Sequence, residues 1–195
     1  MGLVPPTSRA PVAEDIYLAA LGYQTWNFNP YAISAADSPT SQTVFALAVP
    51  VAPGVVYTGV KLIVSTPGAG TTPVAFQVGL ASQANMGAQG TVLTQSGNLN
   101  GSASLTTNGI QTFPFLAPYT ETITGMRMVL ILQNGAFGTT PFTIERTGAS
   151  SVFSQSGPAL VATAGLAAAA LPANGNSLGV NFAGGTARAY WVALY

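Results

Sequence analysis

The sequence predicts an all-β protein, a jelly-roll-like antiparallel β-sandwich. Two observations lead to this fold class. From Tyr23 onward, apolar residues recur at every second position, which is the period of a strand with one buried face. Turn dipeptides such as Pro53-Gly54, Asn108-Gly109 and Asn134-Gly135 divide the chain into short segments. About eight to eleven strands fit between these turns, and that number suits a jelly roll.

Residues 1–15 are predicted to form an extended N-terminal arm, and residues 16–195 a single β-sandwich domain. The arm is rich in proline, which blocks regular secondary structure and favours an extended polyproline conformation. Across the boundary, residues 13–21 suit a short helix whose stop signal is Gly22, and a strand that starts at Ile16 is the alternative.

The clearest strand signals lie in the middle and at the end of the chain. Val60, Leu62 and Val64 share one face of a strand whose other face carries Lys61. Met126–Leu132 is almost continuously apolar, which predicts a central strand covered on both faces. The alternating stretches that predict half-buried strands are Val44–Val49, Val55–Val64, Val74–Leu80, Phe142–Glu145 and Arg188–Tyr195.

Two further features concern loops. Residues 157–187 contain no charged residue and are rich in Ala, Gly, Asn and Ser, which predicts a soft loop region. A short helix at Ala167–Ala170 and a loop that packs on a neighbouring subunit are the alternatives there. The tetrapeptide Gly-Thr-Thr-Pro occurs at 70–73 and again at 138–141, each time before a predicted strand. One turn solution used twice is favoured over an internal duplication.

Charged residues are scarce. Five Lys and Arg and five Asp and Glu make 5% of the chain, with a formal net charge of zero; an ordinary globular protein has about 25%. Without a basic patch, we expect no nucleic-acid partner and no polybasic membrane anchor. A free monomer with so few charges should be poorly soluble, so we expect much of its surface to lie in contacts between proteins.

The residues needed for catalysis or metal binding are missing or badly spaced. There is no Cys and no His, which removes disulfides, thiolate nucleophiles and the commonest general base and metal ligand. The only lysine, Lys61, lacks a serine in a Ser-x-x-Lys motif, because Thr58 stands there on the opposite face of the strand. We therefore expect no enzyme, cofactor or metal site.

The few acidic residues show no catalytic pattern either. Glu121 is expected in a loop, and Glu145 is expected to form an exposed charge pair with Arg146. Five acids without an Asp-x-Asp pattern also predict no calcium site.

No targeting or membrane segment is expected. The first residues lack the basic and apolar regions of a signal peptide. The longest small-apolar stretch, Ala159–Leu171, is 13 residues long, which is too short to span a bilayer.

Aromatic residues raise one alternative, a glycan platform. Trp26 and Tyr31 lie among Asn residues, and Tyr119 lies in a predicted loop region. Exposed aromatic rings of this kind stack on sugars. For Trp26 a place in the core or in an interface is favoured over this role.

About half of the chain, from Phe45 to Gln133, resembles the β-sandwich virion proteins of tailed bacteriophages, particularly those of actinobacterial hosts. The stretches that carry the resemblance are Tyr57–Ser65, Val74–Ala81, Thr91–Asn98, Phe113–Tyr119 and Met128–Gly135. Members of this group serve as head decoration proteins, minor tail proteins and host-binding modules, so the resemblance implies a virion protein made in the host cytoplasm.

The expected function is therefore structural and non-enzymatic: decoration or cementing of a capsid surface by apolar subunit contacts. The expected partners are further copies of the chain, as a symmetric oligomer such as a trimer, and virion proteins such as the major capsid protein. The residues expected to make these contacts are Pro5, Pro6, Arg9, Leu166 and Leu171. The alternative is a tail-associated receptor or glycan-binding module that uses Trp26, Tyr31 and Tyr119.

Overall fold

The computed structural model describes residues 22–27, 33–82, 89–147, 161–165, 170–179, 183–184 and 189–195. Within these ranges the regular elements are antiparallel strands and one 3-10 turn, Ala103–Leu105. The all-β prediction is confirmed. No helix among the described residues is long and apolar enough to cross a membrane. The predicted arm and the helix-or-strand alternative at 13–21 lie outside the described residues.

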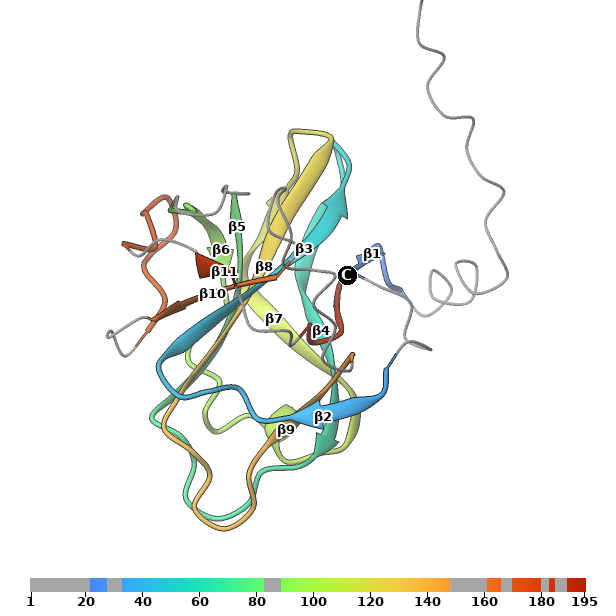
Figure 1. Ribbon diagram of the computed structural model, residues 1–195. Coiled ribbons are helices and arrows are strands. Elements are labelled where there is room, and N and C mark those ends of the chain that lie inside the picture. Colours follow the sequence, from blue (N-terminus) through green and yellow to red (C-terminus); the bar gives the residue numbers. More distant parts are fainter. Residues whose placement is uncertain are drawn as a thin grey trace, which may run out of the picture.

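The strands form two sheets (Figure 1). Sheet A contains β1 (Thr25–Trp26), β2 (Ala35–Asp37), β4 (Val56–Thr66), β7 (Gly109–Thr120), β9 (Thr143–Arg146) and β12 (Val192–Leu194). Sheet B contains β3 (Thr43–Val51), β5 (Ala75–Ser82), β6 (Val92–Gln95), β8 (Gly125–Asn134), β10 (Val161–Gly165) and β11 (Ala183–Gly184).

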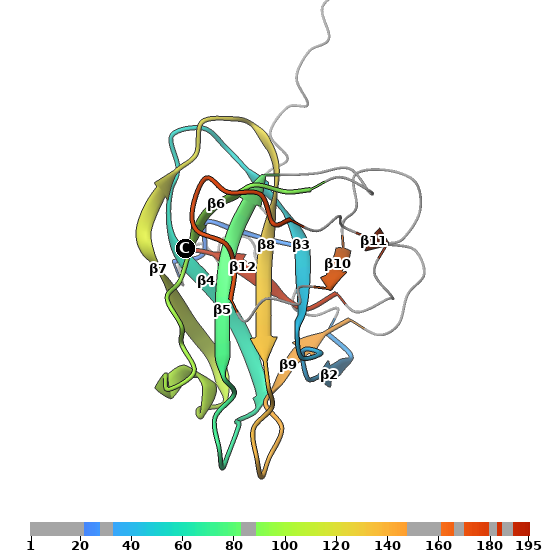
Figure 2. The ribbon, with the colours of Figure 1, turned by 90° about the vertical axis from the view of Figure 1, so that its left-hand side faces the viewer.

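The connectivity is that of a jelly roll. In sheet A the order is β2-β9-β4-β7, and in sheet B it is β3-β8-β5-β6. From β2 to β9 the chain crosses to the other sheet at every connection except the β5–β6 hairpin. Eight strands arranged in this way make the two Greek keys of the jelly roll. Strands β1 and β12 extend sheet A, and β10 and β11 extend sheet B (Figures 1 and 2).

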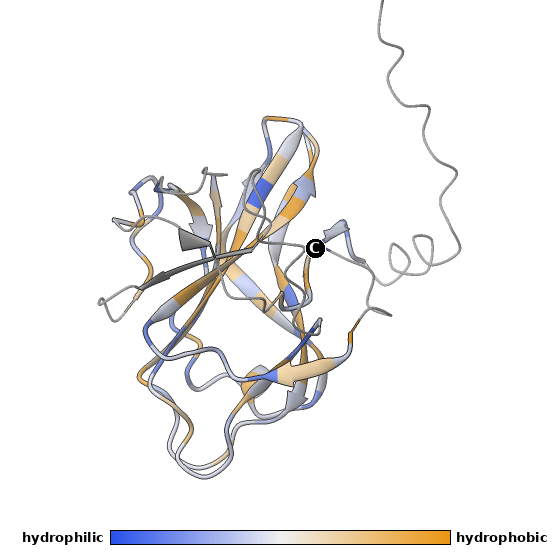
Figure 3. Ribbon diagram, in the orientation of Figure 1, coloured by the Kyte–Doolittle hydropathy of each residue, from blue (hydrophilic) through white to orange (hydrophobic). Residues whose placement is uncertain are grey.

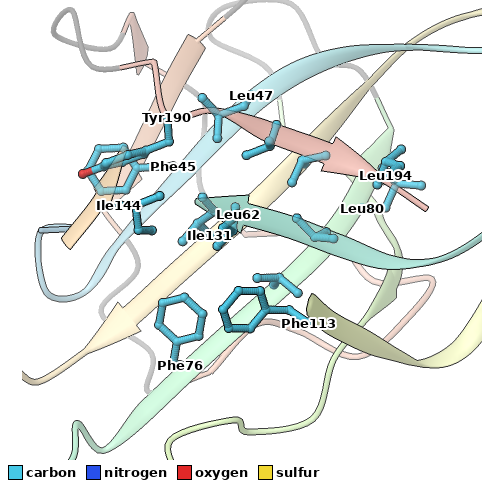
Figure 4. Packing of buried hydrophobic residues seen from close by; sticks show 14 of the residues in the cluster. Phe45, Leu47, Leu62, Phe76, Leu80, Phe113, Ile131, Ile144, Tyr190 and Leu194 are labelled. Atoms are coloured by element: carbon cyan, nitrogen blue, oxygen red, sulfur yellow. The ribbon is translucent and has the colours of Figure 1, made fainter. Parts of the chain in front are cut away.

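The main core lies between the two sheets. Inward residues alternate along the strands, as Val60 and Leu62 do in β4. Three rings form its aromatic centre: Phe76 lies 5.5 Å from Phe113 and 5.3 Å from Phe142, measured between ring centroids. Figure 4 shows Phe76 and Phe113 side by side in this core. Figure 3 shows hydrophobic positions running through the central strands where the sheets meet. The period-two pattern of the sequence therefore does place a face of each long strand in this core.

Strands β3 and β5 are buried on both faces, so the prediction that they are half-buried is wrong. The reason is a second apolar cluster on the outer face of sheet B. Residues 170–179 cross that face and contribute Leu171 and Leu178 to the cluster. Strand β8 is central and buried on both faces, as its continuous apolar run predicts.

The region 157–187, expected to be a loop, is part strand where the structure describes it. Strand β10 pairs with β3 along its whole length, and β11 pairs with β10. Residues 170–179 are tied to sheet B by backbone hydrogen bonds, with Val92 bonding to Gly175 and Asn176 at 2.7 and 2.9 Å. We call residues 170–179 the strap.

The two Gly-Thr-Thr-Pro loops lie side by side at one end of the sandwich (Figures 1 and 2). The Gly138 amide donates to the Thr71 carbonyl at 2.9 Å. The Ala69 carbonyl accepts from the Thr139 amide at 3.0 Å, and the Ala69 amide donates to the Thr140 carbonyl at 3.1 Å. The repeated sequence thus forms two turns that bind each other.

Candidate functional site

Glu121, one of the acids considered for catalysis, is a buried structural anion. It follows β7 and is 1% exposed. Its carboxylate accepts hydrogen bonds from Arg127 Nε at 2.8 Å and Nη2 at 2.7 Å, and from the amides of Thr122 and Ile123 at 2.8 and 3.1 Å. Both oxygens accept hydrogen bonds from within the chain and the side chain is buried, so the carboxylate is not presented to a substrate.

The electrostatics of this pair agree with a structural role. Burial by itself raises the pKa of Glu121, but the hydrogen bonds from Arg127 and the two turn amides outweigh it and lower that pKa below its ordinary value. The hydrogen bond to Glu121 also raises the pKa of Arg127. Both groups stay ionised at neutral pH, which makes Glu121 unsuited to general acid or base catalysis.

A second ion pair among the described residues joins two strands at the edge of sheet A. Arg146 Nε lies 3.7 Å from Asp37 Oδ2, across the β2–β9 pairing. The predicted Glu145–Arg146 pair is therefore wrong in its partner, because adjacent residues of a strand point to opposite faces. Within the described residues, no three acids, histidines or cysteines gather as metal ligands would.

Lys61 lies on the outer face of sheet A between two tyrosine rings. Its Nζ is 4.4 Å from the centroid of Tyr23 and 5.3 Å from that of Tyr195. These are cation–π distances. Nearby, the Thr58 hydroxyl donates to the Tyr195 carbonyl at 3.0 Å. The charge and the hydroxyl both serve to hold aromatic residues against β4.

A shallow hollow lies beside Trp26. Its volume is about 350 Å³, and the described residues that line it are Gln24, Thr25, Trp26 and Pro50. It sits where the short edge strand β1 meets the end of β3. None of these four side chains carries a charge, so the hollow suits a neutral ligand better than an ion.

Asn27 fixes the position of β1, the strand that lines this hollow. Its Nδ2 donates to the Tyr190 carbonyl at 2.7 Å, and its Oδ1 accepts from the Val192 amide at 3.0 Å. Trp26 itself is half-buried and packs against the outer-face cluster of Tyr23, Trp191 and Ala193. The indole is therefore held in one place while part of it stays exposed.

The described residues of the predicted glycan platform pack against different clusters. Trp26 packs on the outer face of sheet A, whereas Tyr119 is half-buried against the core between the sheets. Tyr31 lies outside the described residues. Among the described residues, the neighbours that Trp26 has for such a platform are Gln24, Thr25 and Pro50, and Tyr119 is not one of them.

One of the five predicted contact residues is described. Leu171 is 5% exposed and packs within its own chain, against the outer face of sheet B. The other four lie outside the described residues: Pro5, Pro6, Arg9 and Leu166.

Strand β7 carries an exposed apolar surface whose residues were not among the predicted contacts. On β7, Phe113 and Phe115 point into the core, so the alternate residues face outward. Leu116 is 72% exposed and Ile110 is 49% exposed. We call the outward residues of this strand the β7 face: Ile110, Thr112, Pro114, Leu116 and Pro118.

The sequence did contain a signal for the β7 face. Gly109–Thr120 carries no charge, and both of its alternating faces are largely apolar. Since only one face of an edge strand in a two-sheet sandwich enters the core, the other had to remain on the surface. Val56, which is 42% exposed, pairs with Thr120 and extends this surface onto β4.

No protein-family model matches this chain, and a search of curated proteins found no relative.

Proposed function

We propose that this chain is a non-enzymatic structural protein of a virus particle. It decorates or cements the capsid surface of a tailed bacteriophage through apolar contacts with its own copies and with neighbouring capsid protein. The observation that carries the proposal is the β7 face, an uncharged apolar surface with Leu116 72% exposed. Contiguous exposed apolar surface on a protein this poor in charge is typical of a site of protein association.

Two further observations support an assembly role. Jelly rolls form many viral capsid domains, an analogy of fold that agrees with the resemblance to phage virion proteins. In addition, Arg127 is buried against Glu121, and Lys61 lies over two rings. An interface at the β7 face would therefore desolvate few charges, and its strength would depend little on salt. A symmetric oligomer such as a trimer is the expected form.

The test compares two matched changes from an apolar side chain to glutamine, both at exposed positions. Leu116→Gln alters the β7 face, and Val74→Gln, at a position that is 66% exposed beside the paired Gly-Thr-Thr-Pro loops, is the control. Particles would be assembled with each variant and the bound copies counted. Leu116 would be buried in the proposed interface, and loss of its contact there should lower the number of bound copies about tenfold or more.

Immunogold labelling of intact particles gives the location. Label spread over the head, with occupancy lowered by Leu116→Gln alone, supports the proposal. Equal occupancy of both variants, or no label on any particle, contradicts it. Label confined to the tail favours the second candidate function.

That second candidate is binding of a neutral glycan at the hollow beside Trp26. A fixed, partly exposed indole bordered by an amide and a hydroxyl is the arrangement that stacks on a sugar ring and hydrogen bonds its hydroxyls. The chain has two tryptophans, and Trp191 is fully buried. Titration with host-wall oligosaccharides should change only the Trp26 emission, and Trp26→Phe should abolish the change. Unchanged fluorescence across a glycan panel argues against this candidate.

A further inference from the structure

We propose that the β7 face receives residues 1–12 of a second copy of this chain. The proposal rests on the proposed function only in supposing that copies of the chain meet side by side. Beyond the proposed function, the proposal names the surface that receives the neighbouring copy and the segment of that copy that binds there.

The β7 face is bounded on one side and open along its length. Across the sheet, Ile110 pairs with Ile63, Thr112 with Lys61 and Pro114 with Gly59. Tyr195 packs closely over Gly59, where an added Cβ would lie 2.5 Å from the tyrosine hydroxyl. The Tyr195 ring therefore covers β4 beside Pro114, whereas Leu116, further along β7, remains 72% exposed.

The partner must bind by side-chain packing. β7 pairs with β4 on one edge, and Pro114 and Pro118 remove two amide donors from the strand. The Ala117 carbonyl already accepts from the Thr94 hydroxyl at 2.9 Å, and prolines in an edge strand protect it against pairing with an added strand. An extended segment with apolar side chains and no need of a continuous ladder is the occupant that fits.

Residues 1–12 have this chemistry. The segment has a single charged side chain, Arg9, and is otherwise apolar or neutral. Its three prolines favour an extended polyproline conformation, so docking costs less conformational entropy than ordering an ordinary chain. The apolar residues of the segment are Met1, Leu3, Val4, Pro5, Pro6, Ala10, Pro11 and Val12.

The point where the described chain starts lies next to this face. The position of a Cβ on Gly22 is 3.9 Å from Lys61 Nζ, and the Gln24 side-chain amide donates to the Val56 carbonyl at 3.1 Å. The 21 residues before Gly22 reach up to about 70 Å when extended. Residues 1–12 end ten residues before Gly22, which gives a reach of up to about 34 Å of extended chain, against a length of roughly 27 Å for the β7 face. That reach is long enough for them to meet the β7 face of a neighbouring copy.

Disulfide trapping tests the contact directly, because the chain has no cysteine of its own. One full-length variant carries Pro6→Cys, and a second, isotopically labelled, carries Thr112→Cys on the β7 face. The control replaces Thr112→Cys with Thr72→Cys, an exposed threonine in the paired loops at the end of the sandwich. Mixed pairs are oxidised in solution, without particles, and the linked peptides are counted by mass spectrometry.

We expect the 6–112 link between labelled and unlabelled chains to exceed the 6–72 link at least tenfold. Adding Leu116→Gln to the Thr112→Cys chain should lower the 6–112 yield severalfold while circular dichroism stays unchanged. Equal yields of the two links overturn the proposal. So does a doubly substituted chain that forms the 6–112 bond within itself at high dilution, because its own arm then occupies the face. Since no particle is used, failure of capsid decoration leaves this result unaffected.

Discussion

The side-chain amides of Gln77 and Gln95 lie next to each other on the outer face of sheet B and together hold the strap. Gln77 Nε2 donates to Gln95 Oε1 at 3.3 Å. Gln77 Oε1 accepts from the Leu171 amide at 2.7 Å, and Gln95 Nε2 donates to the Pro172 carbonyl at 2.8 Å. Between them, Gly79 leaves room for the Leu171 side chain, which would lie 3.2 Å from a Cβ there. These contacts explain why β5 is buried on both faces.

Gln77→Leu should loosen the strap. The substitution keeps the volume but leaves the buried Leu171 amide without its acceptor, at a cost of about 1–3 kcal/mol. Urea denaturation measures the change in the free energy of unfolding. Gln111→Leu is the control, because the Gln111 amide donates to Asn108 in an exposed turn. A loss no larger than that of the control would show that the amide pair does not hold the strap.

Gly59→Ala should destabilise sheet A. Its Cβ would lie 2.5 Å from the Phe113 carbonyl oxygen and 2.5 Å from the Tyr195 hydroxyl, and the backbone atom cannot move away. Overpacking of this kind costs about 1–3 kcal/mol. The same change at Gly101, where nothing lies within 4 Å, should change stability by less than about 0.5 kcal/mol. Thermal unfolding of the two variants makes the comparison, and similar melting temperatures would contradict it.

The Glu121–Arg127 pair should make stability depend on acid. The folded protein lowers the pKa of Glu121, so the pair contributes its full stability above the unfolded value of about 4.3. That contribution is lost as the pH falls through the folded pKa. Glu121→Gln breaks the pair and leaves a buried Arg127, which should cost about 3–5 kcal/mol at pH 7.

The variant should also show a flatter stability profile below about pH 4.3 than the parent. Glu145→Gln serves as control, since Glu145 is only half-buried. Equilibrium denaturation from pH 7 to pH 3 gives both numbers. An unchanged acid profile in Glu121→Gln would exclude Glu121 as the group responsible.

Gly70→Ala should separate crowding from backbone strain in the paired loops. Gly70 has φ +85°, and an added Cβ would collide with the Thr139 hydroxyl and lie 2.8 Å from its amide nitrogen. Gly54 has φ +82° but nothing within 4 Å of its Cβ position. Both substitutions carry a left-handed strain of about 1–2 kcal/mol. Calorimetry should therefore show a larger loss for Gly70→Ala, and equal losses would mean that the loops do not constrain each other.

The class of the fold could be predicted from the amino-acid sequence. Period-two alternation and regularly spaced turns are local properties, so they predicted strands and a jelly roll, and the unbroken apolar run Met126–Leu132 predicted the central strand β8. The absence of Cys and His likewise excluded disulfides, thiolate nucleophiles and histidine ligands, and the single lysine left one candidate for a Ser-x-x-Lys motif. These conclusions come from residue counts, which do not depend on the fold.

Which surfaces are covered depends on how distant segments pack together, and local patterns could not predict it. β5 is buried on both faces because the strap, more than 90 residues later, folds over it; the contact between Gln77 and Leu171 spans 94 residues. Arg146 pairs with Asp37 across two strands that are distant in sequence. On β7 both faces are apolar, so alternation alone could not say which would face outward. Sheet packing made that choice when Phe113 and Phe115 entered the core and Leu116 was left on the surface, because a sandwich buries one face of its edge strands.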